Sequence, residues 1–492
     1  MGNPDDDKKT EGQVLSEKLC FDIKNCWDAA SEEELTEIES FAKQYRQFLD
    51  RGKTEREFVK AALELLREKD FKDLDLLLST PGSLKPGERV YQNIKGKSLV
   101  FAVIGRKPFT EGVNIVGAHV DSPRIDLKTN PLYEDSELAM LDTHYYGGIK
   151  HYQWLTIPLA MHGTVIDQKG LKRDICIGED TDDPVFCITD LLPHLAREQM
   201  AKKASDFVDG EGLDILAGSR PYKDQKAKDK VKLNLLNILH EKYGLLEEDF
   251  AGAELEFVPA HKARDLGFDR SMIGGYGHDD RCCAFAALHG ALSFAALDAD
   301  SAIPEKTVVC LLTDKEEIGS MGNTGAQSRL FENFIAYLGV KTLDGGLAAW
   351  SEISLRQCLG KSAMLSADVN SAFDPNYESV YDKKTSSYLG KGIVLSKATG
   401  RGGKVGGSEA NAEFCQRVQA ILNRNKVRWQ FGALGKVDKG GGGTIALNVA
   451  NLGVEVLDCG IPVLSMHSPF EVISKIDLYT TYKGYIAFLR EA

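Results

Sequence analysis

The sequence predicts an α/β protein in which one sheet is covered by helices on both faces. Short, almost wholly apolar runs alternate with segments whose apolar residues have helical spacing, and the alternation extends over about 200 residues. Buried strands are predicted for 98–105, 112–122, 306–317, 361–368, 452–458 and 461–468, and helices for 279–297, 324–338, 407–424 and 469–489.

The first part of the chain is predicted to open with two helices. Two capping-box patterns, Ser31 to Glu34 and Thr54 to Glu57, precede stretches with apolar residues at helical spacing. Residues 126–265 have a different pattern, with aromatic and Thr-rich short runs followed by a polar stretch rich in Lys and Asp. We therefore expect one α/β domain (1–125 and 266–492) interrupted by an inserted, mainly β domain (126–265).

Composition excludes several classes of protein. The 492 residues are 43% hydrophobic and 27% charged, which is typical of a globular chain, and the net charge of −13 disfavours nucleic acid as a partner. The ten cysteines form no CxxC pair, and the polar N-terminus does not resemble a signal peptide, so reduced thiols in the cytoplasm are expected. The most apolar run, 282–297, is shorter than the roughly 20 residues that span a bilayer, so no membrane association is predicted.

Ligand-type side chains end several of the predicted strands. In an open α/β sheet the carboxyl ends of parallel strands meet at the edge where sites form. The side chains at these positions are His119 and Asp121, Glu316 and Glu317, Asp368, and His467, and the pair Asp279–Asp280 opens the apolar helix. Singly, such residues are more often turns, solvated pairs or helix caps.

Imidazole and carboxylate donors without a thiol favour zinc, manganese or cobalt. The donors exceed the needs of one ion, so we expect two divalent ions that together activate a water molecule. Of the adjacent Glu316 and Glu317, one can bind metal while the other acts as a base. Asp121 is placed to fix the tautomer of His119.

Taken in order, six blocks resemble the aspartyl aminopeptidase (aminopeptidase I) family of metallopeptidases. The blocks are GAHVDSPR (117–124), YYGGIKHYQW (145–154), GYGHDDR (275–281), DKEEIGSMGNTGAQS (314–328), SADVNSAFDPNYES (366–379) and LSMHSPFE (464–471). The resemblance implies a zinc-dependent exopeptidase acting on peptides with a free N-terminus. It also implies a three-layer α/β/α catalytic domain with a mixed sheet, an inserted dimerisation domain, and a tetrahedral dodecamer built from dimers.

The same resemblance assigns roles to individual residues. It makes His119, Asp279, Glu317, Asp368 and His467 the metal ligands, with Asp279 as the bridge. Family members usually have Asp-Asn where this chain has Asp279-Asp280, so the choice of bridge between these two rests on register, and Asp279 is favoured. The resemblance makes Glu316 the general base and Asp121 the residue that orients His119. His194, in LLPHLAR (191–197), resembles a histidine that family members insert into a neighbouring subunit's site, where it can stabilise an oxyanion.

The family resemblance says less about which N-terminal residue the enzyme prefers. Family members specific for acidic N-terminal residues have a lysine where a gapless comparison places Ser396, and Lys397 follows one position later. Lys397 is therefore a candidate for binding a substrate carboxylate, and a solvated surface lysine is the alternative. Asp374 also replaces a histidine of the family pattern.

Two other functions remain compatible with such a site. A carboxypeptidase or a deacylase would use the same metal and water chemistry, because that chemistry does not fix the leaving group. A metal-stabilised assembly without catalysis would need the ligands but would have no use for Glu316 as a base.

Overall fold

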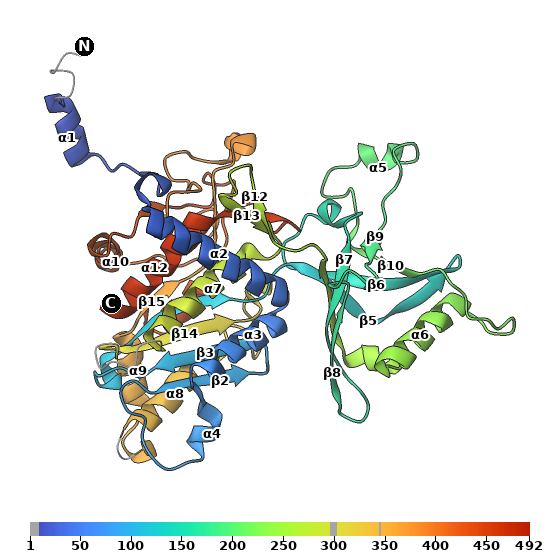
Figure 1. Ribbon diagram of the computed structural model, residues 1–492, viewed down its shortest axis with the longest axis horizontal. Coiled ribbons are helices and arrows are strands. Elements are labelled where there is room, and N and C mark those ends of the chain that lie inside the picture. Colours follow the sequence, from blue (N-terminus) through green and yellow to red (C-terminus); the bar gives the residue numbers. More distant parts are fainter. Residues whose placement is uncertain (1–8, 296–302, 344–345) are drawn as a thin grey trace.

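The computed structural model describes residues 9–295, 303–343 and 346–492. The described chain forms two lobes that lie side by side (Figure 1). The larger lobe is built on a nine-stranded mixed sheet, in the order β1-β2-β3-β14-β4-β15-β19-β17-β18. Its strands are β1 (Lys72–Asp73), β2 (Arg89–Ile94), β3 (Ser98–Val103), β4 (Val113–His119), β14 (Thr307–Thr313), β15 (Ala363–Ser366), β17 (Ile393–Ser396), β18 (Trp429–Phe431) and β19 (Glu455–Gly460).

The central strands of this sheet run in one direction. β14, β4, β15 and β19 pair in parallel, whereas β3 and β17 flank them in antiparallel pairing. Parallel strands are buried on both faces, which explains why the sequence shows them as continuous apolar runs. The carboxyl ends of the four parallel strands consequently meet at one edge.

Helices cover both faces of the nine-stranded sheet, so the predicted three-layer α/β/α architecture is confirmed. Successive side chains of a strand point to opposite faces: in β4, Val116 and Ala118 pack in one core, and Val113 and Ile115 in the other. The first core includes α2 (Glu32–Arg51), α3 (Glu55–Glu68), α7 (His278–Leu292), α10 (Ala412–Arg424) and α12 (Lys475–Glu491); the second includes α4 (Leu74–Leu78), α8 (Leu330–Thr342), α9 (Glu352–Gly360) and α11 (Ala446–Ala450).

The helix starts follow from their sequences. The Thr54 side chain accepts a hydrogen bond from the Glu57 backbone N–H, and the Glu57 carboxylate accepts one from the Thr54 backbone N–H, which forms the expected capping box of α3. The Ser31 side chain caps α2 in the same way, but Glu34 binds Lys483 instead of closing the box. The predicted helix 279–297 is observed as α7 and a short 3₁₀ turn to Ala295; its last two positions lie outside the described residues.

The smaller lobe is a seven-stranded antiparallel sheet with its own core, in the order β8-β7-β11-β5-β6-β10-β9. We call it the inserted unit (Arg124–Pro259). Its strands are β5 (Arg124–Asp135), β6 (Leu138–Tyr146), β7 (Leu159–Ile166), β8 (Lys172–Ile177), β9 (Cys187–Ile188), β10 (Ile215–Gly218) and β11 (Glu254–Pro259). Helix α5 (Arg197–Ala201) precedes the stretch rich in Lys and Asp, and that stretch leads into α6 (Lys230–Tyr243).

A third, five-stranded sheet lies in the order β12-β13-β21-β20-β16. It comprises β12 (Arg264–Leu266), β13 (Met272–Gly275), β16 (Asn370–Ser371), β20 (Pro462–Leu464) and β21 (Glu471–Ser474). The run 461–468 therefore supplies a strand, β20, but that strand does not join the main sheet. Six helices in the described part of the chain were not expected: α1 (Glu11–Leu19), which precedes the two predicted first helices, and α4, α5, α6, α9 and α11. No helix among the described residues is long and apolar enough to span a membrane.

Candidate active site

The predicted ligand residues converge at the edge where the parallel strands end. His119 is the last residue of β4, Glu316 and Glu317 form a 3₁₀ turn just after β14, and Asp368 follows β15. Asp279 lies at the start of α7, and His467 lies between β20 and β21. Two sheets and helix α7 thus bring residues far apart in the sequence to one place.

His119 is buried and oriented by Asp121. Its Nδ1 donates to the Asp121 backbone carbonyl at 3.0 Å and lies 3.3 Å from the carboxylate Oδ1. A proton on Nδ1 leaves the Nε2 lone pair free, and Nε2 lies 3.2 Å from Asp279 Oδ1 and 3.9 Å from Asp368 Oδ1. The fold therefore aims Nε2 at two carboxylates.

His467 is held in the corresponding way. Its Nδ1 donates to the Gly148 carbonyl at 2.8 Å, while Nε2 lies 3.2 Å from Asp279 Oδ2 and 3.4 Å from Glu317 Oε2. Gly147, the residue before Gly148, has φ +77°. A Cβ atom added at Gly148 would lie 3.4 Å from His467 Nδ1. The turn after β6 thus provides the carbonyl that sets the tautomer of His467.

Asp279 lies between the two imidazoles, with one carboxylate oxygen facing each. This is the arrangement that a bridging ligand of two ions needs. Asp280 differs, because its Oδ2 accepts a hydrogen bond from the His119 backbone at 3.4 Å. Ligand atoms of His119, Asp279 and Glu317 lie within 4.8 Å of one another, and so do those of His119, Asp280 and Asp368.

The donor set fits divalent cations. Asp279, Glu316, Glu317 and Asp368 face two imidazoles, and among the described residues no Lys or Arg forms an ion pair with these carboxylates. Asp279 Oδ1 and Glu317 Oε1 are buried without a hydrogen-bond partner in the described structure. Buried carboxylate oxygens without donors require a cation, so these residues fit zinc or a similar ion.

Electrostatics in the site reflect the crowding of acidic groups. Burial raises the pKa of Glu316 to about 7; the His119 imidazole opposes this rise, and the Asp121 and Asp279 carboxylates add to it. Burial opposes protonation of His467, but Glu317 and Asp279 override it and raise its pKa to about 11. The site thus attracts positive charge strongly.

A cavity of about 820 Å³ opens beside these residues. Asp279, Glu316, Glu317, Asp368 and His467 line it, together with glycine-rich loops within 400–406 and 435–443. Gly400 donates to the Gly442 carbonyl at 2.7 Å, which joins the two loops. The site therefore has room for several residues of a substrate.

Lys397 does not line this cavity. Its ammonium lies 3.3 Å from Glu409 at the surface, whereas the preceding Ser396 does line the cavity. Two other lysines line it: Lys404, which pairs with Glu409 at 2.9 Å, and Lys436, which donates to the Ser379 carbonyl at 2.8 Å. The surface position predicted as the alternative for Lys397 is the one observed.

His194 lies in an exposed turn of the inserted unit and does not line the cavity of its own subunit. The structure also brings in residues to which the sequence analysis gave no role. Glu471 accepts backbone hydrogen bonds from both His467 (2.7 Å) and Asp279 (3.0 Å), and Tyr146 donates to Asp121 (2.9 Å). Both lie within the recognised blocks, but nothing in the sequence indicates their partners.

Comparison with known proteins gives one consistent result. A model of the aminopeptidase I zinc metalloprotease (M18) family matches residues 48–489. A probable M18 family aminopeptidase 1 from Clostridium acetobutylicum is 49% identical over 471 residues, covering 96% of this chain and 99% of the relative. A similarly described protein from Thermotoga maritima is 44% identical over 469 residues, covering 95% of this chain and 99% of the relative.

Solved structures agree with this assignment. The crystal structure of an M18 family aminopeptidase from Thermotoga maritima has a TM-score of 0.88 at 42% identity, covering 96% of this chain and 100% of that one. The crystal structure of aminopeptidase I from Clostridium acetobutylicum has a TM-score of 0.86 at 45% identity, with the same coverage. The chain belongs to the M18 family of aminopeptidase I zinc metalloproteases and is a metal-dependent aminopeptidase, an exopeptidase of the hydrolase class.

Proposed function

We propose that this aminopeptidase uses a two-ion centre held by His119, Asp279, Glu317, Asp368 and His467, with Asp279 as the bridge. The observation that carries the proposal is the placement of Asp279, whose two oxygens each lie 3.2 Å from a different histidine Nε2. The ions would be Zn²⁺, with Mn²⁺ or Co²⁺ able to replace it. When bound, such ions polarise the scissile carbonyl and lower the pKa of water.

Glu316 acts as the general base in this proposal. Its carboxylate lies 4.0 Å from His119 Nε2, beside the ligands, and it faces the cavity. Glu316 takes a proton from the attacking water and then delivers it to the leaving nitrogen when the peptide C–N bond breaks. Asp121 keeps His119 and the Glu316 backbone in place: its backbone carbonyl accepts from His119 Nδ1, and its carboxylate accepts from the Glu316 N–H.

We propose that the substrate is a peptide with a free N-terminus and that the site prefers neutral over acidic N-terminal residues. The lysines that line the cavity are each engaged with a protein oxygen, Lys404 with Glu409 and Lys436 with Ser379, and Ser396 carries no charge. An acidic substrate side chain would therefore find no free cation among the described lining residues. Leucyl and alanyl substrates should exceed aspartyl and glutamyl ones in kcat/KM.

We propose further that the enzyme is a homo-oligomer, a tetrahedral dodecamer built from dimers, in which His194 enters a neighbouring subunit's site. The turn around His194 and the following helix α5 expose apolar side chains, with Leu195 and Met200 each 69% exposed, as expected of a segment buried by a partner. A solved structure of Saccharomyces cerevisiae mApe1, 23% identical over 92% of this chain (TM-score 0.72), is described as a dodecamer. In that position the imidazole would donate to the developing oxyanion.

The proposal is tested by hydrolysis of matched peptides that differ only in a free or an acetylated N-terminus, with and without a chelator. We expect cleavage of the free form alone, loss of cleavage with the chelator, and recovery on addition of zinc, manganese or cobalt. Cleavage of the acetylated peptide at its C-terminus would indicate a carboxypeptidase instead, and removal of the acetyl group would indicate a deacylase. Metal-dependent assembly without any hydrolysis would indicate a binding protein.

A further inference from the structure

The Asp121 carboxylate is fully buried and gathers donors from different parts of the fold. Oδ1 accepts the Glu316 backbone N–H at 3.1 Å and lies 3.3 Å from His119 Nδ1. Oδ2 accepts the Glu317 backbone N–H at 3.2 Å and the Tyr146 hydroxyl at 2.9 Å. Of these four donors, Tyr146 alone belongs to the inserted unit, on its strand β6.

Tyr146 is itself held by a buried arginine. Arg124 and Tyr146 are direct cross-strand partners of β5 and β6, and the guanidinium carbon lies 3.9 Å from the centre of the tyrosine ring. This distance places a cation on an aromatic face, which is attractive and restricts both side chains. Arg124 also binds Asp126 at 2.7 Å and forms an ion pair with Glu256 of β11.

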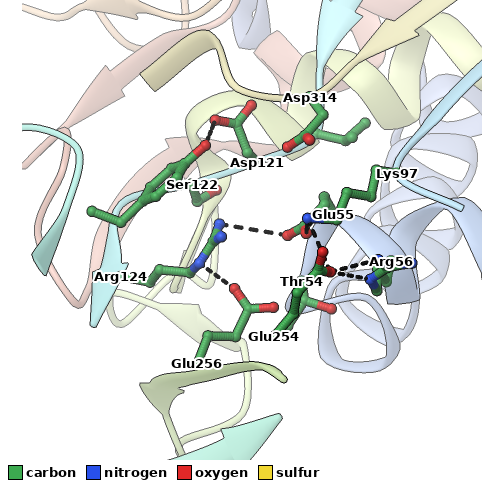
Figure 2. A network of polar contacts seen from close by, with 12 residues as sticks. Thr54, Glu55, Arg56, Lys97, Asp121, Ser122, Arg124, Glu254, Glu256 and Asp314 are labelled. Carbon is green, nitrogen blue, oxygen red and sulfur yellow. Dashed lines mark hydrogen bonds and ion pairs between the residues drawn. The ribbon is translucent and has the colours of Figure 1, made fainter. Parts of the chain in front are cut away.

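The arginine connects the inserted unit to the catalytic lobe. Its Nη1 lies 3.5 Å from Glu55, in the first turn of α3, and Figure 2 shows Arg124 between Glu55 and Glu256. Glu55 also forms an ion pair with Lys97 at 3.3 Å, and Lys97 forms a second ion pair with Glu254 of β11 at 3.0 Å. Arg124 and two of its three carboxylate partners, Glu55 and Glu256, are buried, so each of these charges depends on the others.

We propose that Tyr146 is a positioning residue of the aminopeptidase, and that Arg124 and its carboxylates hold it against Asp121. Through this contact the seating of the inserted unit on α3 sets the orientation of Asp121, and with it His119 and the Glu316–Glu317 backbone. The proposal rests on the roles proposed above for Asp121 and Glu316. Tyr146 does not line the cavity, so it acts through Asp121 rather than on the substrate.

Tyr146→Phe is the direct test, because it removes the hydroxyl and keeps the ring under Arg124. Partners that orient a metal ligand are each worth 10–100-fold in metal affinity or activity. We expect zinc affinity, measured by competition with a chelator, and kcat each to fall about 10-fold. KM and the melting temperature should stay near wild type. Tyr145→Phe is the matched control: Tyr145 is the preceding residue of β6, it is exposed, and its hydroxyl forms no hydrogen bond with any described residue, so neither quantity should change.

A double-mutant cycle with Asp121→Ala shows whether Tyr146 acts through Asp121. Zinc affinity should fall in D121A, and Y146F should then lower it by less than about twofold, because the shared contact is already lost. Wild-type zinc affinity and kcat in Y146F, or a lower melting temperature as its only change, would overturn the role of Tyr146 while D121A still tests Asp121. Wild-type zinc affinity in D121A would overturn both roles.

Discussion

Asp279 and Asp280 are adjacent and chemically identical, yet the fold gives their carboxylates different surroundings. The Asp279 oxygens face the imidazoles of His119 and His467, whereas an Asp280 oxygen accepts the backbone N–H of His119. The first position suits a metal bridge, and the second suits a residue that supports the end of β4. Asp279 is therefore proposed as the bridge because of where its carboxylate points, since Asp280 has the same side chain.

Substitution by asparagine separates these two roles. Asp279→Asn leaves one carboxylate oxygen where a bridge needs two. We therefore expect metal affinity to fall by more than about 100-fold, which exceeds the loss seen when a residue that only orients a metal ligand is replaced. Asp280→Asn keeps an oxygen that can accept the His119 N–H, and its loss should be at most about 10-fold. Metal content of the purified variants after dialysis measures both. Equal loss in the two variants, or a larger loss in D280N, would contradict the bridge.

The convergence of His119, Glu317 and Asp368 could be predicted because each follows an apolar run, and parallel strands end at one edge. Glu471 and Tyr146 could not be predicted, because their roles depend on backbone amides and carboxylates supplied by other elements. Glu471 and Asp279, for example, are 192 residues apart. Lys397 also shows what the sequence could not predict. Ser396 lines the cavity, whereas Lys397, the next residue, pairs with Glu409 at the surface.

At the scale of elements, strand β21 ties two ligand segments together through its first residue. Glu471 is buried, its Oε1 accepts from His467 and its Oε2 accepts from Asp279. His467 has φ +64°, a backbone conformation that residues other than glycine rarely adopt without support from their surroundings. The Glu471 hydrogen bond supplies such support, and it fixes both ligands to the third sheet.

Glu471→Gln tests this link. A glutamine has one acceptor oxygen, and its NH₂ group would face a backbone N–H, so one of the two hydrogen bonds is lost. We expect zinc affinity and kcat to fall about 10-fold while KM changes by less than twofold. Steady-state kinetics and chelator competition measure the effects. Glu455→Gln, the same change on β19 at a partly exposed position, serves as the control, and equal behaviour of the two variants would contradict the role of Glu471.

The sequence predicted strands better than it predicted their partners. An apolar run predicts that a strand is buried, and this held for β3, β4, β14, β15 and β19. It does not specify which sheet the strand joins, so β20 was wrongly expected in the main sheet. Helix α6 was missed because it begins inside a stretch rich in Lys and Asp, where the apolar residues Leu235, Leu236 and Leu239 are only partly buried.

At the scale of the whole molecule, a second charged cluster joins the two lobes. His162 of β7 lies between two carboxylates, Glu57 of α3 at 2.8 Å and Glu179 at 3.2 Å. Glu179 also pairs with the buried ammonium of Lys53 at 2.6 Å. Burial alone would raise the pKa of Glu179, but His162, Lys53 and Lys262 lower it to about 2, from an ordinary value of 4.5.

A lowered carboxylate pKa makes stability depend on pH in a defined direction. The stabilisation from Glu179 is complete above pH 4.5 and is lost as the pH falls through about 2, because the unfolded chain takes up the proton first. Glu179→Gln should lower the free energy of unfolding by about 2 kcal/mol at pH 7, and by progressively less as the pH falls below about 4.5. Melting temperatures from pH 7 to pH 3 measure this. A difference that stays constant over this range would contradict the ion-pair account.

The proposed oligomer predicts complementation between inactive subunits. If His194 acts in a neighbouring site, a His194→Ala subunit has an intact Glu316 and lacks only its neighbour's imidazole. A Glu316→Gln subunit can supply that imidazole. Co-expression of the two variants should restore activity to well above that of either alone, to roughly a quarter of wild type if subunits mix at random and pair in dimers. Mixed oligomers no more active than His194→Ala alone would contradict action across subunits.

The most direct test of the central claim measures metal content and kcat together in wild type and Glu316→Gln. Glutamine keeps the shape of the side chain and removes its basicity, while all five proposed ligands remain. We predict two zinc ions per subunit in both proteins and a kcat lower by about 10²–10⁴-fold in the variant, the usual contribution of a general base. Loss of metal in Glu316→Gln, or activity within about tenfold of wild type, would contradict the assignment of Glu316 as the base beside an intact metal centre.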